Sequence, residues 1–374
     1  MSARLVFALA CIVMAGSDLP RPFAGRLLAD VPPLVNPYFT DFPSGPVDPT
    51  PFRNLATATG HQTSQVSFSA EGFLWFVNPI TGERTEPFRP LGPDFRGPLF
   101  TTLLAFPDGA VANTAFVGSE EPSTRPMAGW ALTSPPRLLG ETPDEWIRAG
   151  GFRAAAGDVD GDRTTDLIFS SGAGGPGSVS IVSLGRDQQI GFGPFGPDFR
   201  GGVAVAAGDL NGDGRADIVL SQESQGGRMV IAEAQGGQVN LRASCSPFGE
   251  GFTGGVVSAV GDVTGDGKVD LIVATASGVP RIKIVDMNAS NGAVRSPFLL
   301  ADFVVNETPV EHFYVGAGLI DGDPFILTHD RFGPRAFVPQ PDGRMENRTL
   351  FPGFGSIGND LSLRPGLFTP PSSP

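Results

Sequence analysis

Short runs of β-forming residues, separated by clusters of glycine and aspartate, recur along the chain. Between residues 199 and 251 there are four such runs. The first two are almost entirely apolar, as expected for strands covered on both faces, and the last two alternate between apolar and polar residues. The runs are VAVAAG at 203–208, IVLS at 218–221, RMVIAEA at 228–234 and QVNLRA at 238–243. The pattern predicts a four-stranded antiparallel sheet.

The same pattern returns every 51 to 53 residues. The segment LGPDFRG at 91–97 reappears as FGPDFRG at 195–201, and GEGFTGG at 249–255 is a looser copy. Aromatic residues continue this spacing: Phe42, Phe95, Trp146, Phe199, Phe252, Phe303 and Phe354. A four-stranded sheet cannot bury both of its faces alone, whereas radial stacking of such sheets buries them and leaves only short edges.

We therefore predict an all-β chain that forms a β-propeller of four-stranded antiparallel blades. Six blades are expected, with seven as the alternative. The predicted repeats are 42–94, 95–145, 146–198, 199–251, 252–302 and 303–353. The remaining segments, 18–41 and the proline-rich 354–374, are expected either to pair and close the ring or to combine into a seventh blade.

Three repeats carry the same acidic loop between their first and second predicted strands. The loops are DVDGDRTTD at 158–166, DLNGDGRAD at 209–217 and DVTGDGKVD at 262–270, with oxygen-bearing side chains at positions 1, 3, 5 and 9. The predicted side-chain ligands of a metal are Asp158, Asp160, Asp162, Asp166, Asp209, Asn211, Asp213, Asp217, Asp262, Thr264, Asp266 and Asp270. Position 7 is expected to bind through its backbone carbonyl in Thr164, Arg215 and Lys268.

Hard oxygen ligands at this spacing predict calcium, about three ions in all. Aspartate and glycine also populate ordinary hairpin turns. However, three loops at the same phase each gather three or four carboxylates, whose repulsion would destabilise a turn without a cation. An EF-hand requires glutamate at position 12, where this chain has Phe169, Leu220 or Val273. Arg163 replaces the glycine of position 6 in the first loop, where we expect strain.

The succession of apolar strand, DxDxDGxxD loop and apolar strand resembles the FG-GAP (VCBS) repeat of the integrin α-subunit N-terminal β-propeller and its bacterial relatives. The resemblance covers the period over about 42–353, and the metal motif covers three repeats. It implies that calcium is structural and that the ligand surface lies on the face opposite the calcium loops. That face would carry 172–178, 223–228 and 275–281, together with Arg200 and Arg228.

The net charge of −13 argues against nucleic acid or an acidic membrane surface as partner. Three divalent cations would add six positive charges and bring it to −7. Residues 1–17 resemble a signal peptide, with Arg4 ahead of an apolar run, and no later stretch is long and apolar enough to span a membrane. We expect a monomer that is secreted, extracellular or held at the cell surface. Cys11 falls in this leader, which leaves Cys245 without a disulfide partner.

Residues that signal catalysis are scarce. The three histidines, His61, His312 and His329, have no partner at a zinc spacing, and neither a GxSxG elbow nor a P-loop occurs. The leading expectation is a module that binds or displays a protein or a carbohydrate and is not an enzyme. The alternative is an extracellular polysaccharide lyase or hydrolase built on a propeller of this type.

Overall fold

The computed structural model describes most of the chain between residues 66 and 348. The predicted signal peptide at 1–17 and the segments 18–41 and 354–374 lie outside the described residues. The described residues are 66–70, 72–77, 85–97, 99–104, 114–119, 125, 127–131, 136–141, 151–183, 188–287, 298–320, 323–330, 332–339 and 345–348.

The strands of this part of the chain form five four-stranded sheets and one two-stranded sheet. The two-stranded sheet pairs β1 (Val66–Ala70) with β2 (Phe73–Val77). The first three larger sheets are β3 (Leu99–Leu104), β4 (Thr114–Ser119), β5 (Ala128–Ala131) and β6 (Arg137–Glu141); β7 (Phe152–Gly157), β8 (Asp166–Ser171), β9 (Val179–Ser183) and β10 (Gln188–Phe192); and β11 (Val203–Gly208), β12 (Asp217–Gln222), β13 (Met229–Gln235) and β14 (Gln238–Cys245). The last two are β15 (Val256–Gly261), β16 (Asp270–Thr275), β17 (Arg281–Asp286) and β18 (Phe298–Val304); and β19 (Tyr314–Ile320), β20 (Asp323–Asp330), β21 (Gly333–Pro339) and β22 (Met345–Arg348).

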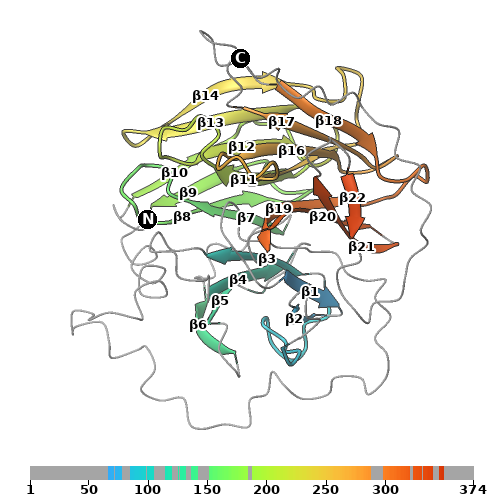
Figure 1. The fold of residues 1–374 in the computed structure, drawn as a ribbon. Coiled ribbons are helices and arrows are strands. Elements are labelled where there is room, and N and C mark those ends of the chain that lie inside the picture. Colours follow the sequence, from blue (N-terminus) through green and yellow to red (C-terminus); the bar gives the residue numbers. More distant parts are fainter. Residues whose placement is uncertain are drawn as a thin grey trace.

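Each larger sheet is antiparallel, and its strands pair in chain order. The first strand of each sheet contacts the first strand of the next: β3 with β7, β7 with β11, β11 with β15, and β15 with β19. Figure 1 shows this succession of sheets from teal β3–β6, through green and yellow, to red β19–β22. Sheets stacked through their first strands are the blades of a propeller. The predicted all-β propeller of four-stranded blades is confirmed.

The predicted number of blades is wrong. The described residues form five four-stranded blades, not six or seven. The first predicted repeat, 42–94, contributes only β1 and β2 to the described strands. Aromatic spacing marks where a repeat begins, but it does not report how many strands follow, and this is why the sequence predicted a full blade here.

The second strands of three blades are buried almost completely. Every residue of β8 and β16 is buried, and so is every residue of β12 except its last. Apolar side chains fill the space between neighbouring blades, where Ile168 lies in one cluster with Ile218 and Leu220. Strand β14 has no buried residue, because it is the last strand of its blade. The contrast explains why the inner runs of the sequence are apolar and the outer runs are half polar.

The repeated GPDFRG segment forms a turn that leads into a first strand. In the copy at 195–201, the N–H of Phe199 donates to the carbonyl of Gly196 at 3.4 Å. Gly196 has a φ of 94°, a conformation that glycine adopts without strain. The Arg200 side chain donates to two backbone carbonyls of the same turn. The copy at 91–97 makes equivalent bonds, so the repeat encodes a turn.

Backbone hydrogen bonds tie each of three blades to the entry of the next. Each of these bonds joins the loop between the second and third strands of one blade to the segment that precedes the first strand of the following blade. The bonds join Gly174 N to Arg200 O, Gly255 N to Gly226 O, Gly278 N to Val310 O and Phe313 N to Ala276 O, at 2.8 to 2.9 Å. We call them the inter-blade bridges.

The last blade departs from the regular spacing. Phe303, the aromatic residue expected ahead of its first strand, lies instead in β18 and packs on Phe337 with ring centroids 5.7 Å apart. Val310 takes part in the bridge ahead of β19. Phe303 is therefore a core residue and not a turn anchor.

Gly208, at the end of β11, allows two blades to approach closely. A Cβ atom at this position would lie 2.4 Å from Cγ1 of Val260, a fully buried residue of β15. Because a β-branched side chain cannot move aside within a packed core, Gly208→Ala is expected to destabilise the protein by about 1–3 kcal/mol. Urea unfolding measures this. Gly251→Ala, where the added Cβ meets nothing within 4 Å, is the control and should be close to neutral.

Candidate metal centre

The three acidic loops connect the first strand to the second in consecutive blades. The first joins β7 to β8, the second β11 to β12, and the third β15 to β16. In each loop, the last aspartate is the first residue of a buried second strand: Asp166, Asp217 and Asp270. These three aspartates are 0%, 3% and 2% exposed. The strand thus fixes one carboxylate in the protein interior, and the loop brings the others to it.

The first aspartate of each loop organises the turn. The carboxylate of Asp158 accepts hydrogen bonds from the backbone N–H groups of Gly161 at 2.7 Å, Asp162 at 3.1 Å and Arg163 at 2.7 Å. The other two loops repeat this arrangement around Asp209 and Asp262. Aspartate favours such turns because its short side chain reaches the following backbone N–H groups. The three loops therefore share one backbone conformation.

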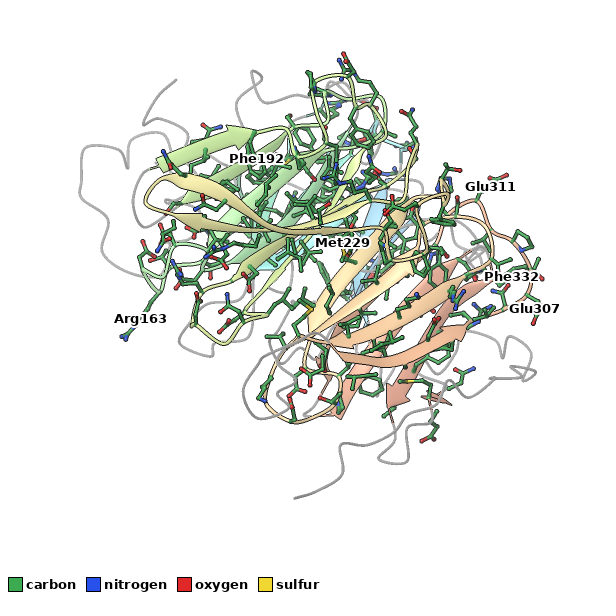
Figure 2. All side chains as sticks on the ribbon, turned by 90° about the horizontal axis from the view of Figure 1, so that it is seen from above. Arg163, Phe192, Met229, Glu307, Glu311 and Phe332 are labelled. Atoms are coloured by element: carbon green, nitrogen blue, oxygen red, sulfur yellow. The ribbon has the colours of Figure 1, made fainter. Side chains whose placement is uncertain are left out.

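Position 6 of each loop has a positive φ. The angle is 84° at Gly214 and 82° at Gly267, and Arg163 adopts 69° at the same place in the first loop. A residue with a Cβ is strained in this conformation. The Arg163 side chain projects away from the ribbon (Figure 2), so the strain is in the backbone.

Arg163→Gly is expected to stabilise the protein by about 0.5–1 kcal/mol, because glycine removes this strain and loses some of the gain through greater freedom in the unfolded chain. The reciprocal variant Gly214→Arg should destabilise the second loop by about 1 kcal/mol, although its Cβ meets nothing within 4 Å. Chemical denaturation of both variants checks the pair. If both variants changed the free energy of unfolding in the same direction, backbone strain at position 6 would be contradicted.

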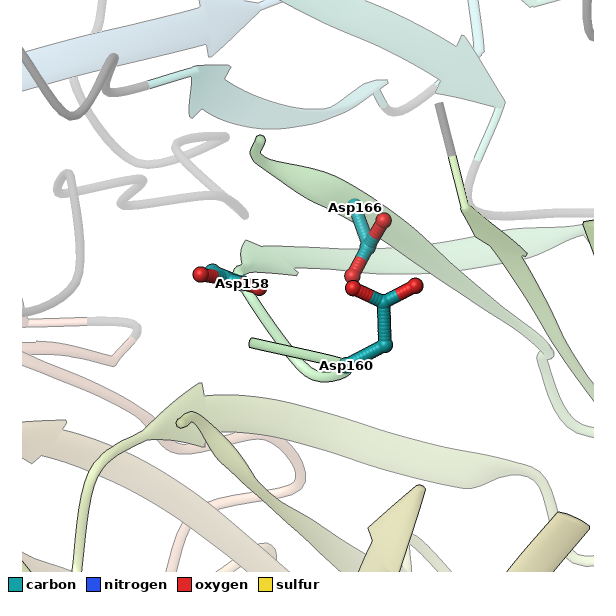
Figure 3. A group of neighbouring side chains, drawn as sticks. All are labelled: Asp158, Asp160 and Asp166. Atoms are coloured by element: carbon teal, nitrogen blue, oxygen red, sulfur yellow. The ribbon is translucent and has the colours of Figure 1, made fainter. Parts of the chain in front are cut away.

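Three carboxylates of the first loop meet at one point. Oxygen atoms of Asp158, Asp160 and Asp166 lie within 4.8 Å of one another. Figure 3 shows the carboxylates of Asp160 and Asp166 pointing toward each other. The arrangement could hold a metal ion, since oxygen ligands at this separation suit a hard divalent cation.

One oxygen of Asp166 lacks a hydrogen bond. Its Oδ2 accepts from the backbone N–H of Val159 at 2.9 Å, whereas the buried Oδ1 has no partner. The nearby hydroxyl of Ser183 donates to Oδ2 of Asp160 at 2.8 Å, and it lies close enough to Asp166 to lower the pKa of that side chain in part. A buried carboxylate oxygen without a partner is costly, and a bound cation would satisfy it.

Burial raises the pKa of the innermost aspartate in all three loops. The pKa of Asp166 rises to about 7, mainly through burial, with further contributions from the charges of Asp160 and Asp162. The pKa of Asp217 rises to about 6 and that of Asp270 to about 7, again chiefly through burial. Burial therefore shifts these groups toward the protonated form relative to an exposed aspartate, and a cation would compete with the proton for them.

The second and third loops lack the third carboxylate of the triad, because position 3 is Asn211 in one and Thr264 in the other. Asp217 Oδ2 accepts from the N–H of Leu210 at 2.9 Å, and Asp270 Oδ2 accepts from that of Val263 at 3.1 Å, as Asp166 does in the first loop. Among the described residues, only the first loop gathers three acidic side chains within metal-binding distance.

The fifth position of each loop faces outward more than the ninth. Asp162, Asp213 and Asp266 each accept a hydrogen bond from the backbone N–H two residues later. The Arg215 guanidinium also donates to Asp213 Oδ2 at 2.8 Å and lowers the pKa of Asp213. The structure therefore brings positions 1, 3 and 9 of the first loop together, while position 5 closes the turn.

Sequence reasoning missed the residues that face these loops from the third strand, which are Ser183, Glu233 and Asp286. They are found only once the register between the second and third strands is known. A small pocket opens beside the first of them, lined by Asp160 and Ser183 on one blade and by Gln235 and Gly237 of the next.

The described part of the chain contains no helix long and apolar enough to cross a membrane. His329 is 3% exposed in β20, near the ring of Tyr314, and burial together with Arg335 lowers its pKa to about 3. His312 lies outside the strands and stacks on Tyr314. Cys245 is a free thiol at the end of β14. His61 lies outside the described residues.

The chain is similar to several known proteins. Residues 158–220 match the model of the FG-GAP-like repeat. No curated protein sequence matches the chain.

Among solved structures, a lectin from Aleuria aurantia, a mutant in complex with Fucα1-6GlcNAc, overlaps with a TM-score of 0.48 at 10% identity. The overlap covers 83% of this chain and 100% of the lectin. A Bacteroides fragilis protein provisionally assigned as a 6-phosphogluconolactonase overlaps with a TM-score of 0.43 at 12% identity, over 79% of this chain and 93% of that one. At these TM-scores the likeness gives no information about ligand or activity.

The matched segment runs from the first acidic loop, through β8 and the second acidic loop, into β12. It therefore contains two of the loops on which the sequence resemblance rests, in the strand context that the motif requires. The chain is a β-propeller that carries FG-GAP-like repeats.

Proposed function

We propose that the protein is an extracellular, calcium-stabilised propeller that binds or displays a protein or carbohydrate and does no catalysis. The acidic triad of the first loop, with its buried and unpartnered oxygen on Asp166, carries the metal part of this proposal. When bound, the cation supplies positive charge that neutralises the carboxylates and links each loop to its second strand.

The residues present fit calcium better than a softer metal. All candidate ligands are oxygen atoms, and the triad contains neither histidine nor cysteine. In each loop the side chains at positions 1, 3, 5 and 9 would hold the ion, together with the carbonyl of Thr164, Arg215 or Lys268. Residues 212–214 of the second loop and 264–268 of the third are exposed.

The proposed ligand surface lies at the opposite end of the blades from the acidic loops. In an antiparallel sheet, the loop between strands one and two and the loop between strands two and three leave from opposite ends. The latter loops, 172–178, 223–228 and 275–281, are anchored by the inter-blade bridges and present exposed residues, among them Gln225 and Val279. Loops whose backbone is held by the inter-blade bridges and whose side chains are exposed are suited to binding the surface of another molecule.

Calorimetric titration of the purified, metal-free protein with calcium tests the metal. We expect about three ions per chain. Magnesium in place of calcium is the control and should bind more weakly, since it requires stricter octahedral geometry. Failure to bind calcium at millimolar concentration would remove the metal part of the proposal.

A glycan array and a set of polysaccharide substrates with product detection test the binding part. Binding without turnover is the expected result, and turnover would favour the alternative of a polysaccharide lyase or hydrolase. Arg200→Ala and Arg228→Ala should weaken binding to any ligand found, because both side chains are exposed beside the proposed surface. Arg137→Ala, an exposed residue of β6, is the matched control and should leave binding unchanged.

A further inference from the structure

Each blade with an acidic loop places an oxygen-bearing residue of its third strand opposite the buried aspartate. Asp270 pairs directly with Asp286 across β16 and β17. In the preceding blade, Ile218 pairs with Ala232, so the next step of the register sets Asp217 opposite Glu233.

The blade of the first loop follows the same rule. Leu167 pairs with Val182, which sets Asp166 opposite Ser183. The three third-strand residues therefore hold equivalent positions.

Two of these third-strand residues touch position 3 of the loop. The Ser183 hydroxyl donates to Asp160 Oδ2 at 2.8 Å. The Asn211 amide donates to Glu233 Oε1 at 3.4 Å and to Asp217 Oδ1 at 3.3 Å. In these two blades, position 3, position 9 and the third-strand residue thus lie side by side.

The charges at position 3 and on the third strand are complementary. In the first loop, position 3 is the acidic Asp160 and the third strand supplies the neutral Ser183. In the second, Asn211 is neutral and the third strand supplies Glu233. In the third, Thr264 is neutral and the third strand supplies Asp286. In each of the three blades, positions 1, 5 and 9 of the loop are aspartates, and either position 3 or the third strand adds one more acidic residue, so that each site includes four carboxylates.

The facing carboxylates, Asp217 with Glu233 and Asp270 with Asp286, need a compensating charge. Like charges placed directly opposite on antiparallel strands destabilise the sheet, and Asp217 and Asp270 are buried as well. In the β7–β10 blade, the corresponding Asp166 is fully buried, its Oδ1 has no hydrogen-bond partner, and its carboxylate points toward that of Asp160 (Figure 3). This oxygen is the observation that points to a bound ion rather than to a solvated acidic surface.

We propose that Glu233 and Asp286 supply the fourth carboxylate of the second and third calcium sites, and that Ser183 supplies a neutral oxygen at the first. This inference rests on the proposed calcium binding and extends the ligand set from the loop to the third strand.

Calorimetric titration of single variants with calcium tests the assignment. Removal of one carboxylate is expected to weaken one of the three sites by about tenfold, because affinity at such sites follows the number of charged ligands. Glu233→Gln and Asp286→Asn should each show this loss at one site. Glu307→Gln, an exposed residue of the segment between β18 and β19 (Figure 2), is the control and should bind as the wild type does.

Glu233 also forms an ion pair with Arg242 of β14, at 2.7 Å. Variants of Glu233 and of Arg242, made separately, distinguish a role of Glu233 as a calcium ligand from a structural role in this ion pair. Arg242→Gln should leave calcium affinity unchanged or raise it, because it removes a competing cation, while Glu233→Gln lowers it. Equal losses of calcium affinity in both variants would show that Glu233 acts only through the ion pair and would overturn the assignment.

An exchange of the two positions gives the sharpest test. The double variant Asn211→Asp with Glu233→Ser reproduces the ligand set of the first site in the β11–β14 blade and is expected to restore most of the affinity lost in Glu233→Gln. If the wild type binds three ions and none of these variants changes any site, this inference fails and the proposed function stands. If the wild type binds no calcium, the proposed function itself fails.

Discussion

Removal of calcium with a chelator is expected to lower the melting temperature by about 10 °C or more. A ligand that binds only the folded state stabilises it by about 2.7 kcal/mol when its concentration is a hundred times its dissociation constant. Three independent sites at that saturation would give about 8 kcal/mol. Each kcal/mol corresponds to about 2–4 °C in a domain of about 150–250 residues and to somewhat less in a larger one such as this propeller. Calorimetric scans with calcium and with chelator measure the shift.

The variant Asp166→Asn separates the cation from ordinary turn stability. In calcium it should destabilise the protein, because it removes the innermost ligand. In chelator it should do the reverse, since it relieves the repulsion between two facing carboxylates and retains an oxygen for the N–H of Val159. Loss of stability under both conditions, or an unchanged melting curve of the wild type in chelator, would contradict a structural cation.

Acid is expected to destabilise the protein through His329. The pKa of this side chain is about 3 in the folded protein, against an ordinary value of 6.5. Between these values the unfolded chain binds a proton that the folded protein does not. The stability contributed by neutral His329 is therefore complete above about pH 6.5 and is lost as the pH falls toward 3, at about 1.4 kcal/mol per pH unit.

Urea unfolding at a series of pH values, compared between the wild type and His329→Leu, isolates this contribution. The variant should show a shallower fall in stability below pH 6.5, by up to several kcal/mol at pH 4. His312→Leu is the matched control, because His312 is exposed and near the same Tyr314 ring, and it should retain the slope of the wild type. If the free energy of unfolding fell with pH equally steeply in the wild type and in His329→Leu, protonation of His329 would be excluded as the cause.

The propeller architecture could be predicted from the sequence because its repeat combines two independent signals. The inner runs such as VAVAAG and IVLS are apolar since both of their faces are covered, and the GPDFRG segments encode a turn through the positive φ of a glycine. The number of blades could not be predicted in the same way. Phe303 keeps the spacing but packs inside β18, and the first repeat contributes two described strands and not four.

The loop part of the candidate site could also be predicted, because all its residues lie within nine positions of one another and their spacing alone sets the geometry. The third-strand residues could not. Glu233 and Asp286 lie sixteen residues beyond the aspartates they face, Asp217 and Asp270. That relation depends on the length of the next loop and on the strand register. Only the pairing of β16 with β17, and of β12 with β13, reveals it.

The inter-blade bridges also bear on how such a protein could diversify. They join backbone groups, so they place little demand on side chains beyond glycine at close approaches such as Gly255, where a Cβ would meet the Glu223 carbonyl at 1.9 Å. Exposed residues of these loops such as Val279 can therefore change identity without loss of the contacts that hold the blades together, whereas Gln225, with a φ of 59°, is more restricted. New ligand specificities could arise by substitution at such exposed positions while the blades stay the same, as occurs in other folds that carry variable loops on a rigid scaffold.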